Sequence, residues 1–193
     1  MFEALEKFDR YLLLKINAIH TPFFDSLMYY ISDNSWPTVL ILLATAFLFY
    51  RKYALKKAIE FLVGCAIVFA CTDLSTNLVK HAVKRYRPTH NLEIKEQVRV
   101  VNDYHGGKYG FFSAHAANTF SVMTFVFFCV HWIAKKYRLL FFIYPAMVVY
   151  SRMYLGVHYP SDTLTGIFSG LIFGRIVFLI MNKHFLKFDV QKV

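Results

Sequence analysis

A short polar stretch, residues 151–162, places a Ser-Arg pair, a histidine and an aspartate between two long apolar segments. His158 and Asp162 are four residues apart, so on a helix the carboxylate would face the imidazole. A carboxylate that holds one ring nitrogen fixes the tautomer and leaves the other nitrogen free as a nucleophile or base. Arg152 supplies a planar fork that suits two oxygens of a phosphate. A lone His–Asp pair at this spacing is more often structural than catalytic, so the choice between these roles depends on the rest of the chain.

A second cluster of basic residues lies earlier in the chain. Lys80 and Arg87 are seven residues apart, which is two helical turns, so we expect both side chains on one side of a helix that Pro88 ends. The neighbouring Lys84 and Arg85 suit anionic lipid headgroups. Taken alone, the cluster fits a basic segment beside a membrane as well as it fits a phosphate site.

The third polar feature is Phe112-Ser113-Ala114-His115, at the start of another apolar segment. The small residues Ser113 and Ala114 allow an anion to approach the free N–H groups of a helix N-terminus. His115 follows in the first turn. A single histidine at such a position is usually an interfacial residue, but here it is expected to share one face with both basic clusters. A phosphate would neutralise those cations, which are costly near a bilayer when unpaired.

The composition indicates which elements must position these residues. The chain has 193 residues, of which 57% are hydrophobic and 19% aromatic, whereas soluble domains average about 45–50% apolar residues. The formal net charge is +10, but the basic residues lie at the ends of apolar runs, as in membrane proteins. The sequence therefore argues against a nucleic-acid partner. It predicts an all-α fold, a polytopic helix bundle in a membrane.

We expect one domain over residues 1–193, in three parts. Residues 1–35 form amphipathic N-terminal helices, of which the first, about 2–18, lies at the membrane surface. Residues 36–182 form the bundle with the site, and residues 183–193 form a basic tail. Five apolar segments predict five spans, and a sixth follows only if the N-terminal helices cross. These segments are approximately 37–50, 58–79, 113–134, 139–155 and 161–181, and a polar loop occupies 89–112.

Alternating spans place all three polar clusters at one face of the membrane. The opposite face then carries most of the remaining basic residues, namely Arg51, Lys52, Lys56, Lys57, Lys135, Lys136, Arg138, Lys183, Lys187 and Lys192. Positive charge in short loops marks the cytoplasmic side. We therefore expect the polar clusters to face outward, which for a bacterial inner-membrane protein means the periplasm or exterior.

The three clusters resemble the signatures of the type 2 phosphatidic acid phosphatase (PAP2) superfamily, which includes vanadium haloperoxidases. The pattern K-x6-RP matches Lys80 through Arg87-Pro88, and SR-x5-H-x3-D matches residues 151–162. The middle pattern, usually PSGH, retains its serine and histidine, while Phe112 and Ala114 replace proline and glycine. The resemblance covers roughly residues 36–182.

The resemblance implies a role for each matched residue. His158 would attack phosphorus to form a phosphohistidine, Asp162 would orient its ring, and His115 would protonate the leaving oxygen. Water would then hydrolyse the intermediate, with no metal and no other cofactor. The residues implied to hold the phosphoryl oxygens are Lys80, Arg87, Ser113, Ala114 and Arg152.

The resemblance also suggests substrates. The small size, without an added soluble domain, resembles undecaprenyl-diphosphate phosphatases of this superfamily, so the first expectation is a membrane lipid phosphatase acting on undecaprenyl diphosphate. Phosphatidylglycerophosphate, phosphatidic acid and lipid A are the alternatives. An alternative of another class is a non-catalytic protein that binds anionic lipids, and a haloperoxidase would use the same cation cage. The expected partners are a lipid phosphate and the bilayer, and the sequence does not predict an oligomeric state.

Overall fold

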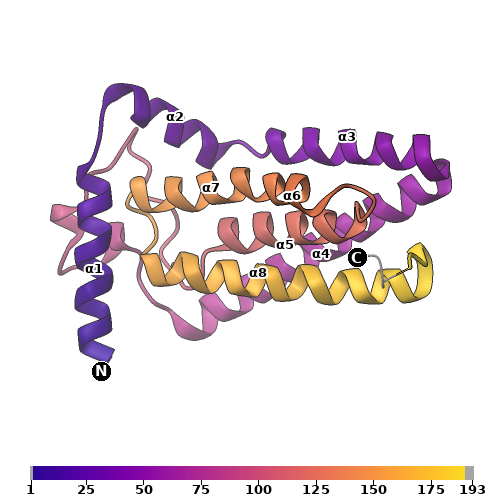
Figure 1. Cartoon of the computed structure of the whole chain (residues 1–193). Coiled ribbons are helices and arrows are strands. Elements are labelled where there is room, and N and C mark those ends of the chain that lie inside the picture. Colours follow the sequence, from indigo (N-terminus) through magenta and orange to yellow (C-terminus); the bar gives the residue numbers. More distant parts are fainter. Residues whose placement is uncertain (1, 190–193) are drawn as a thin grey trace.

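The computed structural model describes residues 2–189, and Figure 1 shows that these form a bundle of helices. No β-strand occurs among the described residues. The α-helices are α1 Phe2–Ala18, α2 Pro22–Asp33, α3 Trp36–Tyr53, α4 Leu55–Val83, α5 Ala114–Cys129, α6 Lys135–Arg138, α7 Ile143–Tyr154 and α8 Pro160–Met181. Short helical turns are η1 Pro88–His90, η2 Lys95–Gln97, η3 Leu139–Phe142 and η4 Asn182–Leu186. The all-α prediction is confirmed.

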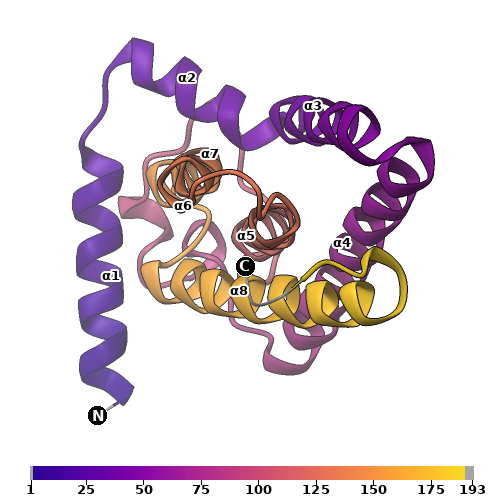
Figure 2. The same ribbon diagram turned by 45° about the vertical axis from the view of Figure 1, so that its right-hand side comes forward.

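The central helix of the bundle is α5. In Figure 2 it is enclosed by α3, α4, α7 and α8, while α1 stands outside the bundle and crosses one end of it. By length and composition, α4 and the α8–η4 segment are each able to cross a membrane. The pair α2 and α3, bent by 56°, would make a third span, and α5 is a shorter apolar helix. The polytopic membrane bundle is therefore confirmed, while the count of five or six spans stays a prediction.

Local sequence signals explain where several helices begin and end. Thr21 caps α2 by accepting a hydrogen bond from the Phe24 N–H at 3.2 Å. Pro22 occupies the first turn, where a backbone N–H would have no partner within the helix, so its missing N–H costs no hydrogen bond. Ser113 caps α5 in the same way. Helix α4 ends at Val83 because Lys84 adopts a left-handed conformation with φ 54°.

A stripe of three glycines sets the contact between α5 and α8. Gly166, Gly170 and Gly174 recur every fourth residue on the face of α8 that packs against α5. A Cβ atom on Gly166 would lie 2.7 Å from the carbonyl oxygen of Ser113, and one on Gly170 would lie 2.6 Å from that of Ala117. Only glycine permits this close approach. The stripe therefore holds α5 close against α8 from Ser113 to Thr124.

One helix is shorter than the sequence suggests. We expected the third apolar segment to continue to residue 134, but α5 ends at Cys129 and a turn follows, closed by the Ile133 N–H and the Val130 carbonyl at 2.9 Å. The turn brings the indole of Trp132 to 5.0 Å from the ring centroid of Phe49. Packing in this aromatic cluster overrides the helical periodicity.

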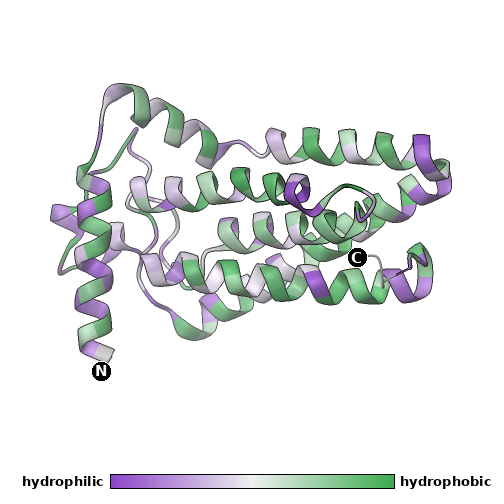
Figure 3. Cartoon of the chain, in the orientation of Figure 1, coloured by the Kyte–Doolittle hydropathy of each residue, from purple (hydrophilic) through white to green (hydrophobic). Residues whose placement is uncertain are grey.

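The polar clusters gather at one end of the bundle. The end of α4, the start of α5, the end of α7 and the start of α8 all lie at the end that α1 crosses (Figure 1). Figure 3 shows hydrophobic residues along the long helices and hydrophilic residues at the two ends. The opposite end, where α3 and η4 lie, carries basic residues such as Arg51 in the last turn of α3 and Lys183 in η4. Of the predicted tail, residues 190–193 lie outside the described residues.

Candidate active site

His158 lies in the turn between α7 and α8 and is fully buried. Its Nδ1 atom is 3.5 Å from Oδ2 of Asp162. The proximity agrees with the sequence prediction, but the reason we gave for it was wrong. The helix begins only at Pro160, so the pair spans the helix start instead of sharing one helical face. Oδ2 of Asp162 is fixed there because it accepts the N–H of Tyr159 at 3.1 Å, as in a capping box.

The surroundings of His158 favour its neutral form. Burial lowers the pKa of this imidazole well below 6.5, and the positive charges of Arg87, Arg152 and Lys80 lower it further. Neither ring nitrogen has a hydrogen-bond partner among the described residues. A neutral imidazole with a free nitrogen is the form that can attack an electrophile.

Arg87 reaches the site from the loop, where its backbone is extended with φ −66° and ψ 157°. The expectation that Lys80 and Arg87 share one helical face was wrong, because the left-handed Lys84 turns the chain out of α4. The Arg87 Nε–H donates to the carbonyl of Tyr109 at 3.2 Å, while Nη1 is buried without a partner. Burial, followed by the charge of Arg152, lowers the pKa of Arg87 to about 10. The arginine stays charged at neutral pH.

Arg152 is fully buried near the end of α7. One terminal nitrogen donates to the Ser32 hydroxyl of α2, and the other donates to the Tyr104 hydroxyl at 3.0 Å. Its Nε atom is buried without a partner. Sequence reasoning missed Ser32 and Tyr104, since they lie 120 and 48 residues away from Arg152 and carry no motif.

The start of α5 lies against Asp162. The Ser113 N–H donates to the backbone carbonyl of Asp162 at 3.0 Å, and the buried Ser113 hydroxyl accepts the Ala116 N–H at 3.4 Å. Ala114 and His115 follow in the first turn and line a groove on the outside of the bundle. His115 interacts electrostatically with His158. The cluster at residues 112–115 therefore lies beside the clusters at residues 80–88 and 151–162.

The polar loop, residues 89–112, covers the His158–Asp162 pair. Gly110 donates its N–H to the carbonyl of Arg85 at 2.9 Å. A Cβ atom at this position would lie 3.1 Å from Oδ2 of Asp162 and 3.6 Å from Nδ1 of His158. Glycine therefore allows the loop backbone to cover the His–Asp pair, a role that the sequence did not reveal.

The groove that contains His115 has a volume of about 560 Å³ and runs between α3, α4 and α5. Most of its wall surface is apolar, and Asp73 and Asn118 are among its polar residues. The Asp73 carboxylate accepts hydrogen bonds from Asn77 and Asn118, both at 3.0 Å. The bond from Asn118 joins α4 to α5. Oδ1 of Asn118 is buried without a partner.

The chemistry of the assembled site is that of anion binding. Its unpartnered buried nitrogens belong to Arg87, Arg152 and His158. Lys80, in the last turn of α4, interacts electrostatically with both arginines. Within residues 2–189, no group of three or more His, Cys, Asp or Glu side chains lies close enough together to hold a metal ion. Guanidinium groups bind phosphate oxygens in a fixed planar geometry.

The sequence profile of the PAP2 superfamily matches residues 57–186. The chain belongs to this superfamily. It is 34% identical over 185 residues to a lipid A 4'-phosphatase of Porphyromonas gingivalis, covering 92% of this chain and 75% of that protein. It is 31% identical over 188 residues to a lipid A 4'-phosphatase of Bacteroides thetaiotaomicron, covering 95% and 81% of the two chains. The protein is therefore a membrane PAP2 lipid phosphatase.

Two crystal structures share the fold. A transmembrane PAP2-type phosphatidylglycerolphosphate phosphatase from Bacillus subtilis superposes with a TM-score of 0.71 at 20% identity, covering 94% of this chain and 88% of that one. LpxE of Aquifex aeolicus superposes with a TM-score of 0.64 at 22% identity, covering 86% and 92%. At these identities the likeness concerns the fold alone.

Proposed function

We propose that this PAP2 enzyme removes a phosphate monoester from a lipid A-type sugar lipid at the outer face of the bacterial inner membrane. The observation that carries the chemistry is the buried set of unpartnered nitrogens on Arg87, Arg152 and His158. Two relatives named lipid A 4'-phosphatase, each matched over more than 90% of this chain, support the substrate class. Lipid A is one of the alternatives that the sequence left open, and we favour it over undecaprenyl diphosphate.

In the first step, Nε2 of neutral His158 attacks phosphorus while the cations of Lys80, Arg87 and Arg152 hold the phosphoryl oxygens. The N–P bond forms as the P–O bond to the sugar breaks, and His115 gives its proton to the leaving oxygen. Ser113 and the N–H of Ala114 complete the binding of the phosphoryl group. Side-chain charges placed in advance around the developing negative charge lower the barrier.

In the second step, water attacks the phosphohistidine. His115, now neutral, accepts a proton from the water, and the N–P bond breaks to release inorganic phosphate. Throughout, Asp162 holds the Nδ1–H tautomer of His158 and stabilises the positive charge that the ring carries in the intermediate. This is the role of the aspartate in other His–Asp pairs.

The groove beside His115 gives the lipid chains a place next to the reacting phosphate. It is mostly apolar and lies between helices that are themselves apolar on the outside. Among its walls, Oδ1 of Asn118 offers an unused hydrogen-bond acceptor. A glucosamine lipid has amide and hydroxyl donors close to its acyl chains, whereas a polyprenyl chain has none. This difference supports a sugar-lipid substrate.

Charge supports the outward orientation of the site. The end of the bundle away from His158 carries Arg51 and Lys52 in the last turn of α3 and Lys183 in η4. Basic residues in short loops remain on the cytoplasmic side during insertion. We therefore place His158 at the periplasmic or exterior side, where a lipid that has been moved across the membrane would be dephosphorylated.

A substrate panel tests the proposal. The purified protein in detergent should release phosphate faster from lipid A than from undecaprenyl diphosphate, phosphatidylglycerophosphate or phosphatidic acid at equal surface concentration. His158→Ala, prepared in parallel, controls for contaminating phosphatases. Fastest release from undecaprenyl diphosphate would overturn the substrate assignment. Release from none of the four lipids would favour the alternative of a non-catalytic lipid-binding protein.

A further inference from the structure

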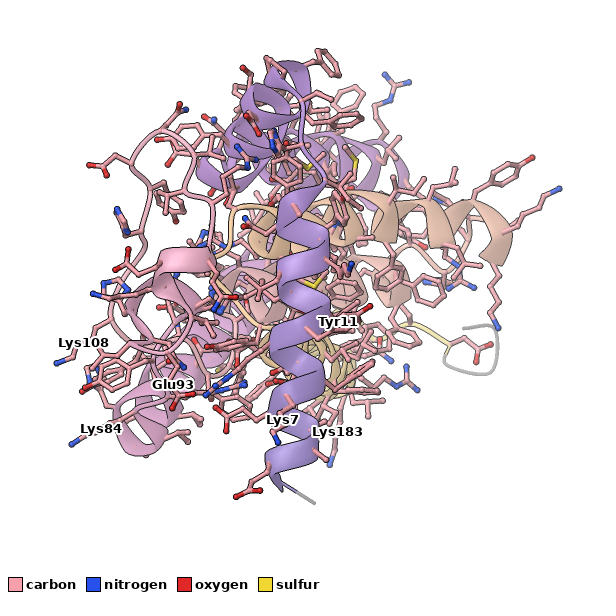
Figure 4. All side chains as sticks on the ribbon, turned by 90° about the vertical axis from the view of Figure 1, so that its left-hand side faces the viewer. Lys7, Tyr11, Lys84, Glu93, Lys108 and Lys183 are labelled. Atoms are coloured by element: carbon pink, nitrogen blue, oxygen red, sulfur yellow. The ribbon has the colours of Figure 1, made fainter. Side chains whose placement is uncertain are left out.

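Helix α1, which sequence analysis assigned to the membrane surface, turns a stripe of buried residues toward the bundle, and two of the three are polar. Asp9, Leu13 and Asn17 recur every fourth residue and are all buried, with 3%, 0% and 2% of their surfaces exposed. The apolar residues Leu5 and Phe8 point away from the bundle and are exposed. In Figure 4, α1 crosses in front of the end of the bundle that carries the site. The buried face of α1 therefore lies against the end of the bundle that carries the site.

Asn17 anchors this helix at its C-terminal end. Its amide nitrogen donates to the backbone carbonyl of Tyr154 at 2.7 Å and to that of Arg99 at 3.0 Å. Its amide oxygen accepts the Arg99 N–H at 2.8 Å. These bonds join α1 to both α7 and the polar loop, so the position of Asp9 is fixed relative to the site.

Asp9 accepts three hydrogen bonds, two of them from Ser161 at the start of α8. Its Oδ1 accepts the Ser161 N–H at 2.8 Å, and its Oδ2 accepts the Ser161 hydroxyl at 2.5 Å. Oδ2 also accepts from Nη2 of Arg85 at 2.7 Å. A carboxylate with this many donors in a buried place is held in one orientation.

Arg85 connects Asp9 to the His–Asp pair. Its Nη1 donates to Oδ1 of Asp162 at 2.6 Å and to the Ser161 hydroxyl at 2.7 Å. Its guanidinium carbon also stacks 4.1 Å from the ring centroid of Tyr159. Each Asp162 oxygen thus has its own partner, since Oδ2 accepts the Tyr159 N–H at 3.1 Å and faces His158. With both ends of its fork on carboxylates, Arg85 is not free to hold a lipid headgroup.

The charges of this network matter for the reaction. Arg85 alone would cancel the charge of Asp162, because one guanidinium balances one carboxylate. Asp9 shares the same guanidinium, so the three groups together keep one negative charge next to His158. Charge–charge interactions are strong in a buried environment. That remaining negative charge is what the ring requires when it becomes positive in a phosphohistidine.

We infer that Arg85 and Asp9 are positioning residues for catalysis, and that α1 contributes to the active site through them. They act on His158 by holding Asp162 in place and by preserving its effective charge. This inference rests on the proposed role of His158 as nucleophile. It assigns a catalytic purpose to a helix that composition alone describes as a surface attachment.

The inference predicts that Asp9→Asn lowers kcat and leaves KM unchanged, because the cations that bind phosphate are untouched. Outer partners that orient metal-bound histidines contribute about 10–100-fold, and we expect a loss of kcat in that range. Arg85→Lys should lose a similar factor, because an ammonium group cannot bridge both carboxylates. The matched control is Glu6→Gln, which removes an exposed charge from the same helix.

A double-mutant cycle distinguishes positioning from general support of the fold. If Asp9 acts through Asp162, then Asp9→Asn should cost little or nothing further in an Asp162→Asn background. A full, additive loss in that background, or a rise in KM with kcat unchanged, would overturn the inference. So would wild-type kcat in Asp9→Asn. Turnover by His158→Ala would instead refute the proposed function, so the two failures are distinguishable.

Discussion

At the residue scale, His158 and His115 differ in their surroundings. His158 is enclosed on all sides and faces Asp162, so it suits a nucleophile that must be neutral and fixed. His115 lies on the groove, where a leaving lipid oxygen would arrive. In the proposed mechanism, His158 attacks phosphorus and His115 transfers the proton.

Replacing His115 should affect substrates unequally. General acid catalysis contributes about 10²–10⁴-fold, so His115→Ala should lose a factor of this size on a lipid phosphate with a poor leaving group. An aryl phosphate needs less protonation of its leaving oxygen, and its rate should fall much less. Steady-state kinetics with both substrates measures the contrast. Equal losses on the two substrates would show that His115 is not the general acid.

The low pKa of His158 predicts the acid side of the pH profile. Because burial and the charges of Arg87, Arg152 and Lys80 lower this pKa, the imidazole should stay neutral as the pH falls through 6.5. After correction for titration of the substrate, kcat/KM for an aryl phosphate should therefore begin to fall only below pH 6.5. Arg87→Gln removes one positive charge, which raises the pKa of His158 and moves the acid limb to higher pH. If kcat/KM of the wild-type enzyme already falls at or above pH 6.5 as the pH is lowered, the result would contradict this account.

At the scale of elements, the apolar periodicity and the breaks at Thr21-Pro22 and Pro88 allowed most helices to be predicted to within a few residues. What could not be predicted was the partner of each polar side chain. Asp9 and Arg85 are 76 residues apart, and either one alone is typical of a solvated helix face or a headgroup contact. The left-handed Lys84 also has no sequence signal, because glycine is the usual residue in that conformation.

The glycine stripe of α8 provides a test at this scale. In Gly170→Val, the new side chain would meet the backbone oxygen of Ala117 and the backbone nitrogen of Ser121, which lie 2.6 and 2.9 Å from a Cβ at this position. Overpacking of this kind typically costs about 1–3 kcal/mol. We expect a lower thermal unfolding midpoint in detergent and reduced activity, since Ser113 shifts with α5. Ile172→Val, at an exposed position of the same helix, should change neither. Unaltered stability in Gly170→Val would show that α5 and α8 are not in close contact.

At the scale of the whole molecule, one end of the bundle carries the candidate active site and the other end carries a cluster of basic residues. Clustering of all three motifs at one end was predictable, because alternating spans bring those segment ends together. Sequence reasoning could not predict that α1 and the polar loop would close this end through buried contacts. The groove beside His115 depends on how α3, α4 and α5 are arranged relative to one another, which no single segment of the sequence encodes.

Thiol labelling in intact cells tests the orientation of this molecule. Gly107→Cys lies in open space on the polar loop, and Lys136→Cys lies in the basic turn α6. Each is made in a Cys71→Ser background, since Cys71 is an exposed cysteine. An impermeant maleimide should label Gly107→Cys and should label Lys136→Cys only after the cells are lysed. The reverse pattern would place the site on the cytoplasmic side.

The central claim, transfer of phosphate to His158, is tested most directly by trapping the intermediate. The enzyme is mixed with a ³²P-labelled substrate, quenched in alkali within milliseconds, digested and mapped by mass spectrometry. Phosphohistidine survives alkali and is lost in acid, so the account predicts an alkali-stable, acid-labile label on the peptide that contains His158. The label should be absent from His158→Ala and should form more slowly in Asp162→Asn. A label on another residue, or an unlabelled enzyme during rapid turnover, would contradict the account.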